Sequence, residues 1–130
     1  MKKILAAGIG GAVGAAVRWI LLQIPLANDS FHPIMTLLIN VSGSFLLGFV
    51  IILFEKKIPV QAEIRVAVTT GFFGGYTTFS TMCKDAVGLL ATGNVPAALL
   101  YLMLSVFLGL LAAWFGIRLG KVFERRTVKE

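Results

Sequence analysis

Apolar residues along the chain gather in four long runs, which short polar segments separate. The runs cover approximately residues 4–23, 33–54, 66–90 and 96–118. A membrane-spanning helix needs about 20 mostly apolar residues, and each run reaches that length. The pattern therefore predicts one integral membrane domain, 1–130, of the all-α class with four transmembrane helices. Residues 119–130 are predicted to form a basic tail.

The third run differs from the others, because small and hydroxyl residues interrupt its centre. Residues 69–81 read TTGFFGGYTTFST. Unpaired backbone groups are not tolerated in hydrocarbon, so such a stretch either lines a cavity or is packed inside protein. We interpret the run as a broken helix, two half-helices joined near residues 74–78.

Small and polar residues recur at helical spacing in the other runs. In the first run, Gly10 and Gly14 have the spacing of a close helix–helix contact. In the second and fourth runs, residues four apart share one helical face. They are Thr36, Asn40, Ser44 and Gly48, and then Tyr101, Ser105 and Gly109. Two interpretations stay open for these stripes, namely helix packing through hydroxyl and amide bridges or a wet pathway lined by O–H and N–H donors.

The composition narrows the classes of function. Hydrophobic residues make up 58% of the chain, against about 45–50% in soluble domains. The polar segments are too short for a soluble catalytic domain, so we do not expect an enzyme. A single cysteine, Cys83, excludes an internal disulfide and a cysteine-based metal cluster. A single histidine, His32, precedes Pro33 and is interpreted as a loop residue.

The net charge of +6 indicates membrane orientation rather than nucleic-acid binding, because the basic residues cluster at run ends and in the tail. With four spans, ten of the 12 Lys and Arg residues fall on the side of the termini. These are Lys2, Lys3, Lys56, Lys57, Arg65, Arg118, Lys121, Arg125, Arg126 and Lys129. Only Arg18 and Lys84 fall on the opposite side. The positive-inside rule then predicts cytoplasmic termini.

The broken third run offers groups for binding ions. Ends of half-helices and freed carbonyls present partial charges inside membranes. The backbone carbonyls of Gly74 and Thr77 are candidates to hold a small cation. The hydroxyls of Thr78, Ser80 and Thr81 are candidates to contact an anion.

Four further residues have both a functional and a plain structural interpretation. Phe79 and Met82 lie one turn apart, and an aromatic ring has a positive edge that an anion can approach. Core packing is the plain alternative for Phe79. Arg18 and Asp85 lie near run ends, where they would line a vestibule. Alternatively, Arg18 snorkels to the interface and Asp85 only marks the boundary.

The depth of the acidic residues bears on the transport mechanism. No Asp or Glu lies deep in any run. Small proton-coupled exporters usually exchange protons at a buried carboxylate. A small proton-coupled multidrug-type exporter is therefore the weaker alternative.

Three segments together resemble the Fluc/CrcB family of fluoride channels. They are residues 10–19 (GGAVGAAVRW), 36–44 (TLLINVSGS) and 71–81 (GFFGGYTTFST), of which the third is the most specific. The resemblance implies a multi-pass protein of the bacterial inner membrane that lets cytoplasmic fluoride out passively and so protects against its toxicity. It also implies a dual-topology-type dimer of two antiparallel subunits, surrounded by lipid and with two pores.

The same resemblance implies roles for individual residues. A structural Na⁺ at the dimer centre would be held by the backbone carbonyls of Gly74 and Thr77. The fluoride pathway would contain Asn40, Phe79, Ser105, Thr36, Ser80 and Thr81, and the family's first-span arginine matches Arg18.

The chain departs from the family pattern in two respects. Met82 stands where the family has its second pore phenylalanine, and a thioether lacks an aromatic edge. The ten-to-two charge bias also differs from the balanced charge that lets one sequence insert in both directions. The chain is therefore either a homodimeric channel or one subunit of a heterodimer with a related antiparallel chain.

Overall fold

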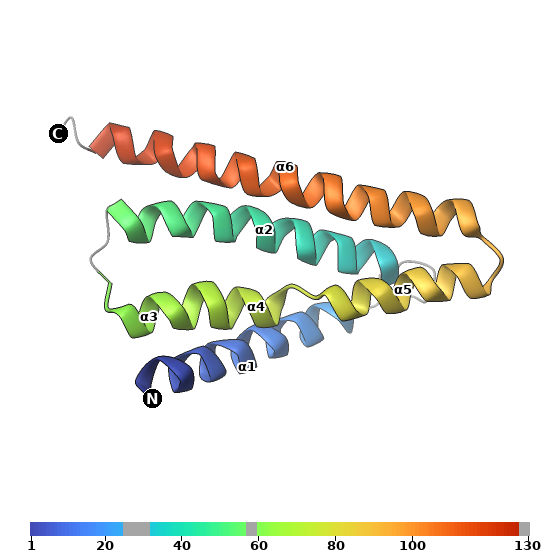
Figure 1. Cartoon of the computed structure of the whole chain (residues 1–130), viewed down its shortest axis with the longest axis horizontal. Helices are drawn as coiled ribbons and strands as arrows, with labels where there is room; N and C mark the ends of the chain where they lie inside the picture. The colour runs from blue at the N-terminus through green and yellow to red at the C-terminus, as the bar shows by residue number, and fades with distance from the viewer. Residues whose placement is uncertain (25–31, 57–59, 128–130) are drawn as a thin grey trace.

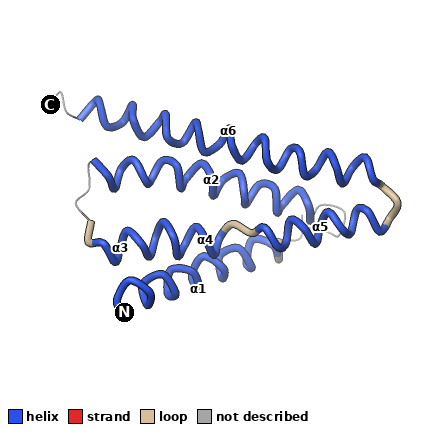
Figure 2. Tube along the Cα trace, in the orientation of Figure 1, coloured by secondary structure: helices blue, strands red, loops and turns tan. Residues whose placement is uncertain are grey.

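The computed structural model describes residues 1–24, 32–56 and 60–127, and within these ranges all regular structure is helical (Figures 1 and 2). The elements are α1 (Lys2–Leu22), α2 (His32–Lys56), α3 (Ala62–Val66), the π-helical segment η1 (Ala67–Phe72), α4 (Phe73–Tyr76), α5 (Phe79–Ala91) and α6 (Val95–Thr127). Lys57 and Lys129, which the charge count includes, lie outside the described residues. The predicted all-α class is confirmed.

Three of these helices are long and apolar enough to cross a membrane. They are α1, the stretch His32–Glu55 of α2, and the stretch Val95–Glu124 of α6. The third apolar run of the sequence is divided among α3, η1, α4 and α5, the longest of which has 13 residues. Length and composition therefore identify three spans directly, where the sequence predicts four.

The helices lie roughly along one direction in successive layers (Figure 1). α6 lies beside α2, and the row formed by α3, η1, α4 and α5 lies on the other side of α2. α1 packs against η1 and α4. The N-terminus and the end of α6 lie at the same end of the bundle, and the α5–α6 turn lies at the opposite end (Figure 1).

Glycines bring α1 into backbone contact with η1 and α4. A Cβ atom added at Gly10 would overlap the carbonyl of Ala67, and one added at Gly14 would overlap the carbonyl of Phe72. From the other side, a Cβ at Gly75 would overlap the carbonyl of Gly11. The close contact predicted from the Gly10–Gly14 spacing is confirmed, and it rests on small residues as membrane helix contacts usually do.

Small residues also join α2 to α6. A Cβ added at Gly48 would lie 2.6 Å from the Ala113 carbonyl oxygen, and one at Gly109 would lie 3.8 Å from the hydroxyl oxygen of Ser44. The periodic stripes of the second and fourth runs therefore meet between α2 and α6.

The helix α6 continues beyond residue 118, the predicted end of the fourth span, as far as Thr127. Its continuation packs on α2. Gly120 is buried against Ile52, and the rings of Phe49 and Phe123 meet edge to face with centroids 6.1 Å apart. These apolar contacts with α2 explain why the helix continues into the basic segment.

Candidate ion pathway at the helix break

Two extended residues separate α4 from α5. Thr77 has ψ 155°, and Thr78 has φ −149° and ψ 121°. The two residues form the loop between α4 and α5 in Figure 2. Among the described residues, α4 therefore ends at Tyr76 and α5 begins at Phe79.

The side-chain amide of Asn40 in α2 hydrogen-bonds to the break through both its nitrogen and its oxygen. The side-chain NH₂ donates to the carbonyl of Thr78 over 3.0 Å, and the side-chain oxygen accepts from the N–H of Thr78 over 2.8 Å. An asparagine NH₂ has two donors. One N–H therefore remains after the bond to Thr78, and it is available to a further acceptor.

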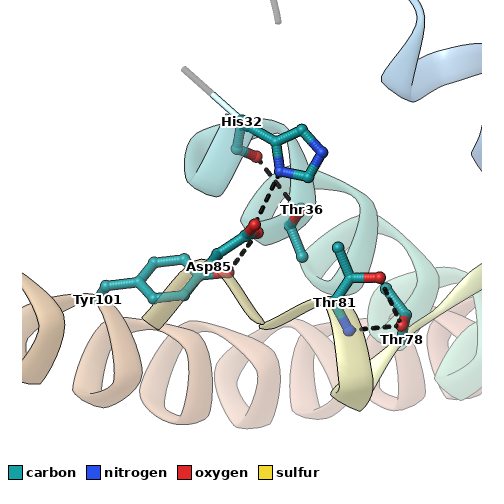
Figure 3. A network of polar contacts seen from close by, with 6 residues as sticks. All are labelled: His32, Thr36, Thr78, Thr81, Asp85 and Tyr101. Atoms are coloured by element: carbon teal, nitrogen blue, oxygen red, sulfur yellow. Dashed lines mark hydrogen bonds and ion pairs between the residues drawn. The ribbon is translucent and has the colours of Figure 1, made fainter. Parts of the chain in front are cut away.

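The hydroxyls at the start of α5 form a small network. Thr78 caps the helix, since its side-chain oxygen accepts from the backbone N–H of Thr81 over 3.1 Å (Figure 3). The same hydroxyl contacts Oγ1 of Thr81 at 3.0 Å and Oγ of Ser80 at 3.3 Å. Three hydroxyls predicted to face an anion thus lie together beside Asn40.

The two predicted cation ligands have different surroundings. In a continuous helix the backbone N–H of Thr78 would donate to the Gly74 carbonyl. Here it donates to the side chain of Asn40 instead. The Gly74 carbonyl is thereby released from the helical ladder. The Thr77 carbonyl accepts a hydrogen bond from Nη1 of Arg18 over 3.2 Å. Arg18, a vestibule candidate from sequence, therefore lies against the break in this chain.

The break brings two helix ends of opposite polarity together. Exposed carbonyls at the end of α4 carry partial negative charge, and exposed N–H groups at the start of α5 carry partial positive charge. The Thr77 carbonyl at this negative end already accepts from the Arg18 guanidinium, whereas the positive start of α5 lies at Phe79 and Ser80.

A hollow of about 230 Å³ lies at this position. Its lining combines polar and apolar residues, namely Asn40, Ser44, Leu47, Thr77, Thr78, Phe79 and Met82. Phe79 is 76% exposed in the single chain. Such exposure does not fit core packing within one chain, the plain alternative for this ring, but it suits a partner surface or a pore.

A second polar cluster lies at the middle of α5, one helical turn beyond Thr81 (Figure 3). Asp85 is buried, with Oδ1 2.8 Å from Nδ1 of His32 and Oδ2 3.4 Å from the donating hydroxyl of Tyr101. The interpretation of His32 as a loop residue is wrong, because it is the first residue of α2 and pairs with a carboxylate. A signal existed, since His32 precedes Thr36 by four residues and extends the polar stripe.

The remaining two pathway candidates lie between α2 and α6. Thr36 is fully buried and donates to the carbonyl of His32 over 3.2 Å. Ser105 is also buried and donates to the carbonyl of Tyr101 over 2.7 Å. Both hydroxyls bond within their own helices, so in the single chain this part of the stripe contributes to helix packing.

Sequence reasoning also missed a contact between α2 and α4. The hydroxyls of Ser42 and Tyr76 lie 3.0 Å apart, and the Tyr76 ring stacks on that of Phe72 with centroids 5.9 Å apart. Ser42 lies between Asn40 and Ser44 in the sequence and does not belong to the stripe. Its partner is 34 positions away, so no local pattern identifies it.

Several known proteins to which this chain is similar belong to one family. The sequence profile described as "CrcB-like protein, Camphor Resistance (CrcB)" matches residues 5–117. The chain is 44% identical over 113 residues to "Fluoride-specific ion channel FluC 2" of Geobacillus kaustophilus, covering 86% of this chain and 88% of the relative.

Two further relatives match along almost their whole length. "Fluoride-specific ion channel FluC" of Rhizobium meliloti is 41% identical over 121 residues, covering 92% of this chain and 96% of the relative. The protein of the same name from Chlorobium phaeobacteroides is 38% identical over 121 residues, covering 92% and 94%. The matched region includes both polar clusters and the break.

Proposed function

Because the chain belongs to the CrcB-like family, we propose that it is a fluoride-selective channel and not an enzyme. It would let cytoplasmic fluoride leave passively across a bacterial inner membrane and so protect against fluoride toxicity. The observation that carries this proposal is the identity of about two residues in five to fluoride-specific channels along almost the whole chain. The geometry of the break supplies a physical basis for the activity.

Fluoride passage requires donors that replace tightly bound water. The free N–H of Asn40, the hydroxyls of Ser80 and Thr81, and the N-terminus of α5 gather at the break. The edge of the Phe79 ring adds a weakly positive, water-excluding surface. A pore narrowed by a partner chain would favour fluoride over the larger chloride. Thr36 and Ser105 would extend the path between α2 and α6.

A passive mechanism is favoured over proton coupling. The carboxylate of Asp85 is buried, but it is paired with His32 rather than standing alone in the bundle. A coupled carrier needs a carboxylate that alternates between protons and substrate. The small multidrug-type exporter therefore stays the weaker alternative.

We further propose that residues 62–91 make a fourth crossing with an interruption at its centre. The segment runs the length of α2 beside it (Figure 1). Interrupted helices are tolerated at membrane depth where they line a cavity or are buried in protein. Four crossings would place both termini on one face, which the charge bias assigns to the cytoplasm.

A second subunit would complete the site. The hollow at Asn40 is open on one side where Phe79 is exposed, and a partner in antiparallel orientation would close it. The outer faces of α1 and α6 are also strongly apolar, which suits lipid or a partner helix. Each pore would then be built from both chains.

The break also suits the structural Na⁺ proposed from the resemblance. Carbonyl oxygens are appropriate ligands for a hard cation, and Gly74 and Thr77 would present two at a negative helix end. The Thr77 carbonyl accepts from Arg18 in the single chain, so Na⁺ would share or replace that contact. Hard cations such as Ca²⁺ and Mg²⁺ take about six or more oxygen ligands, so one chain supplies too few. A site on the dimer axis would gain four carbonyls from two chains, and bound Na⁺ would hold the two breaks together.

The partner is either a second copy or a related chain of opposite orientation. The ten-to-two charge bias favours one orientation for this sequence. Expression of the chain alone, with reporter tags on both termini, separates the two cases. Equal amounts of both orientations would indicate a homodimer, and one orientation would indicate an obligate pair.

The test of the function is fluoride efflux from liposomes that contain only the purified chain, followed with a fluoride electrode. Valinomycin is added to dissipate the potential in potassium-loaded vesicles. Efflux that requires valinomycin and keeps the same rate when a pH gradient is imposed would establish a passive channel. Efflux driven by the pH gradient alone would contradict the proposal.

A further inference from the structure

The second polar cluster contains an ion pair that the proposed pathway has not yet used. The side chain of Asp85 is 5% exposed and that of His32 is 30% exposed. Figure 3 shows the imidazole directed at the carboxylate, with Tyr101 on the far side. One member of the pair is therefore buried and the other is in contact with solvent.

A hollow of about 590 Å³ opens beside this pair. It is lined by His32, Pro33, Lys84, Asp85, Gly88, Leu89 and Thr92. The hollow lies at the end of the bundle where α2 begins and α5 approaches its end (Figure 1). A charged group in this lining acts on any ion that enters here.

The hollow and the break both lie along the polar stripe of α2, with the buried Thr36 between them. Thr36 lies one turn beyond His32, and Asn40 lies one turn beyond Thr36. Thr36 donates to the carbonyl of His32, and Asn40 binds Thr78 at the break. If fluoride passes Asn40 as proposed, the hollow at His32 is a mouth of the same path.

The charges at this mouth are few among the described residues. Besides His32, the titratable groups are Asp85 and the exposed Lys84 of α5 and the hydroxyl of Tyr101 of α6. An ionised, buried carboxylate repels an entering anion and needs a partner. Among the described groups at this mouth, the imidazole of His32 is the one in direct contact with the carboxylate that can carry a positive charge.

We propose that His32 is a positioning residue that compensates the charge of Asp85 at a mouth of the fluoride pathway. This inference rests on the proposed fluoride-channel function. When His32 is protonated, the pair is neutral and the mouth carries the positive charge of Lys84. When His32 is neutral, the carboxylate opposes anion entry.

The consequence is a flux that increases in acid. Imidazole is the side chain that ordinarily changes charge between about pH 5 and about pH 8, and this chain contains one histidine. Protonation of the imidazole neutralises the pair at the mouth. Fluoride enters cells as HF under the same acidic conditions, so the path would open most when export is most needed.

The test is the pH profile of fluoride efflux for wild type, His32→Gln and His32→Lys, with the same pH on both sides. Protein-free liposomes correct for leakage of HF. Wild-type flux should be about fivefold higher at acid than at alkaline pH in this range, the effect of one nearby charge in a water-like dielectric. His32→Gln should give a flat, low profile and His32→Lys a flat, high one.

The outcomes separate this inference from the function. Fluoride-selective wild-type flux with no pH dependence would overturn the role of His32 and leave the channel standing. A pH profile that survives in both variants would also overturn it. Absence of wild-type fluoride flux at every pH would contradict the function, and the inference with it.

Discussion

The two sides of the helix break are held by different kinds of contact. On the side of α1, glycines bring backbone against backbone at Gly14 and Gly75, and the one polar contact described at the break is that of Arg18 with the Thr77 carbonyl. On the side of α2, polar side chains make the contacts, with Asn40 bound to both backbone groups of Thr78. The two sides therefore have different roles. The glycine contacts with α1 fix the position of the break, and the polar groups on the side of α2 are available to ions.

The difference also has an energetic meaning. Glycine contacts have little ability to adapt, because the atom that would clash with an added Cβ is backbone. Polar contacts can exchange one partner for another, including a passing ion. Changes on the glycine side should therefore abolish folding, while changes on the polar side should alter flux in a folded protein.

The largest effect is expected for Gly14→Ala. The added Cβ would overlap the Phe72 carbonyl and lie 2.8 Å from the Tyr76 nitrogen. Separating α1 from α4 should cost about 2–3 kcal/mol or more, and most of the protein should no longer elute as a folded species in detergent. Gly8→Ala on the same helix is the control, because its Cβ meets nothing within 4 Å. Equal loss in both variants would contradict the importance of the contact.

The second-largest effect, a loss of fluoride efflux, is expected for Asn40→Asp. The carboxylate keeps the acceptor for the Thr78 N–H but removes the donor and adds a like charge in the anion path. Fluoride efflux should fall by about 100-fold or more, since one unit charge at close range costs a few kcal/mol at a protein-like dielectric. The protein should still elute as a folded species. Unchanged efflux would remove Asn40 from the pathway.

A smaller effect is expected for Met82→Phe, which adds a second ring edge to the hollow beside Phe79. Fluoride efflux should stay equal or rise by up to about tenfold, because an aromatic edge attracts an anion more than a thioether does. Met82→Leu changes the shape without adding a ring and serves as the control. Complete loss of flux in Met82→Phe alone would contradict its placement beside the pore.

The smallest effect is expected at the contact between Ser42 and Tyr76. Tyr76→Phe removes one hydroxyl of a pair 3.0 Å apart. Thermal unfolding in detergent should show a loss of about 1 kcal/mol, with fluoride selectivity retained. The double variant with Ser42→Ala should lose less than the sum of the two single variants. Additive losses would show that the two hydroxyls do not interact.

Much of the fold could be predicted because it depends on local composition. The long apolar runs predict α1, α2 and α6, and Gly10 and Gly14 identify the face of α1 that makes close contact. Glycines and hydroxyls mark the region where α4 ends and α5 begins. Each of these features is expressed in neighbouring residues.

Other features depend on the tertiary arrangement and could not be predicted. Asn40 and Thr78 are 38 positions apart, and His32 and Asp85 are 53 apart. Their contacts exist only because α2 lies along the interrupted helix. The extension of α6 to Thr127 likewise follows from packing on α2 rather than from hydropathy.

The most direct test of the central claim is electrical recording from the purified chain in a planar bilayer, with fluoride on one side and chloride on the other. A fluoride-selective channel should show a reversal potential displaced far from zero in the direction set by the fluoride gradient, and Asn40→Asp should abolish the current. A reversal potential near zero would mean that chloride passes as readily as fluoride, and it would contradict this claim.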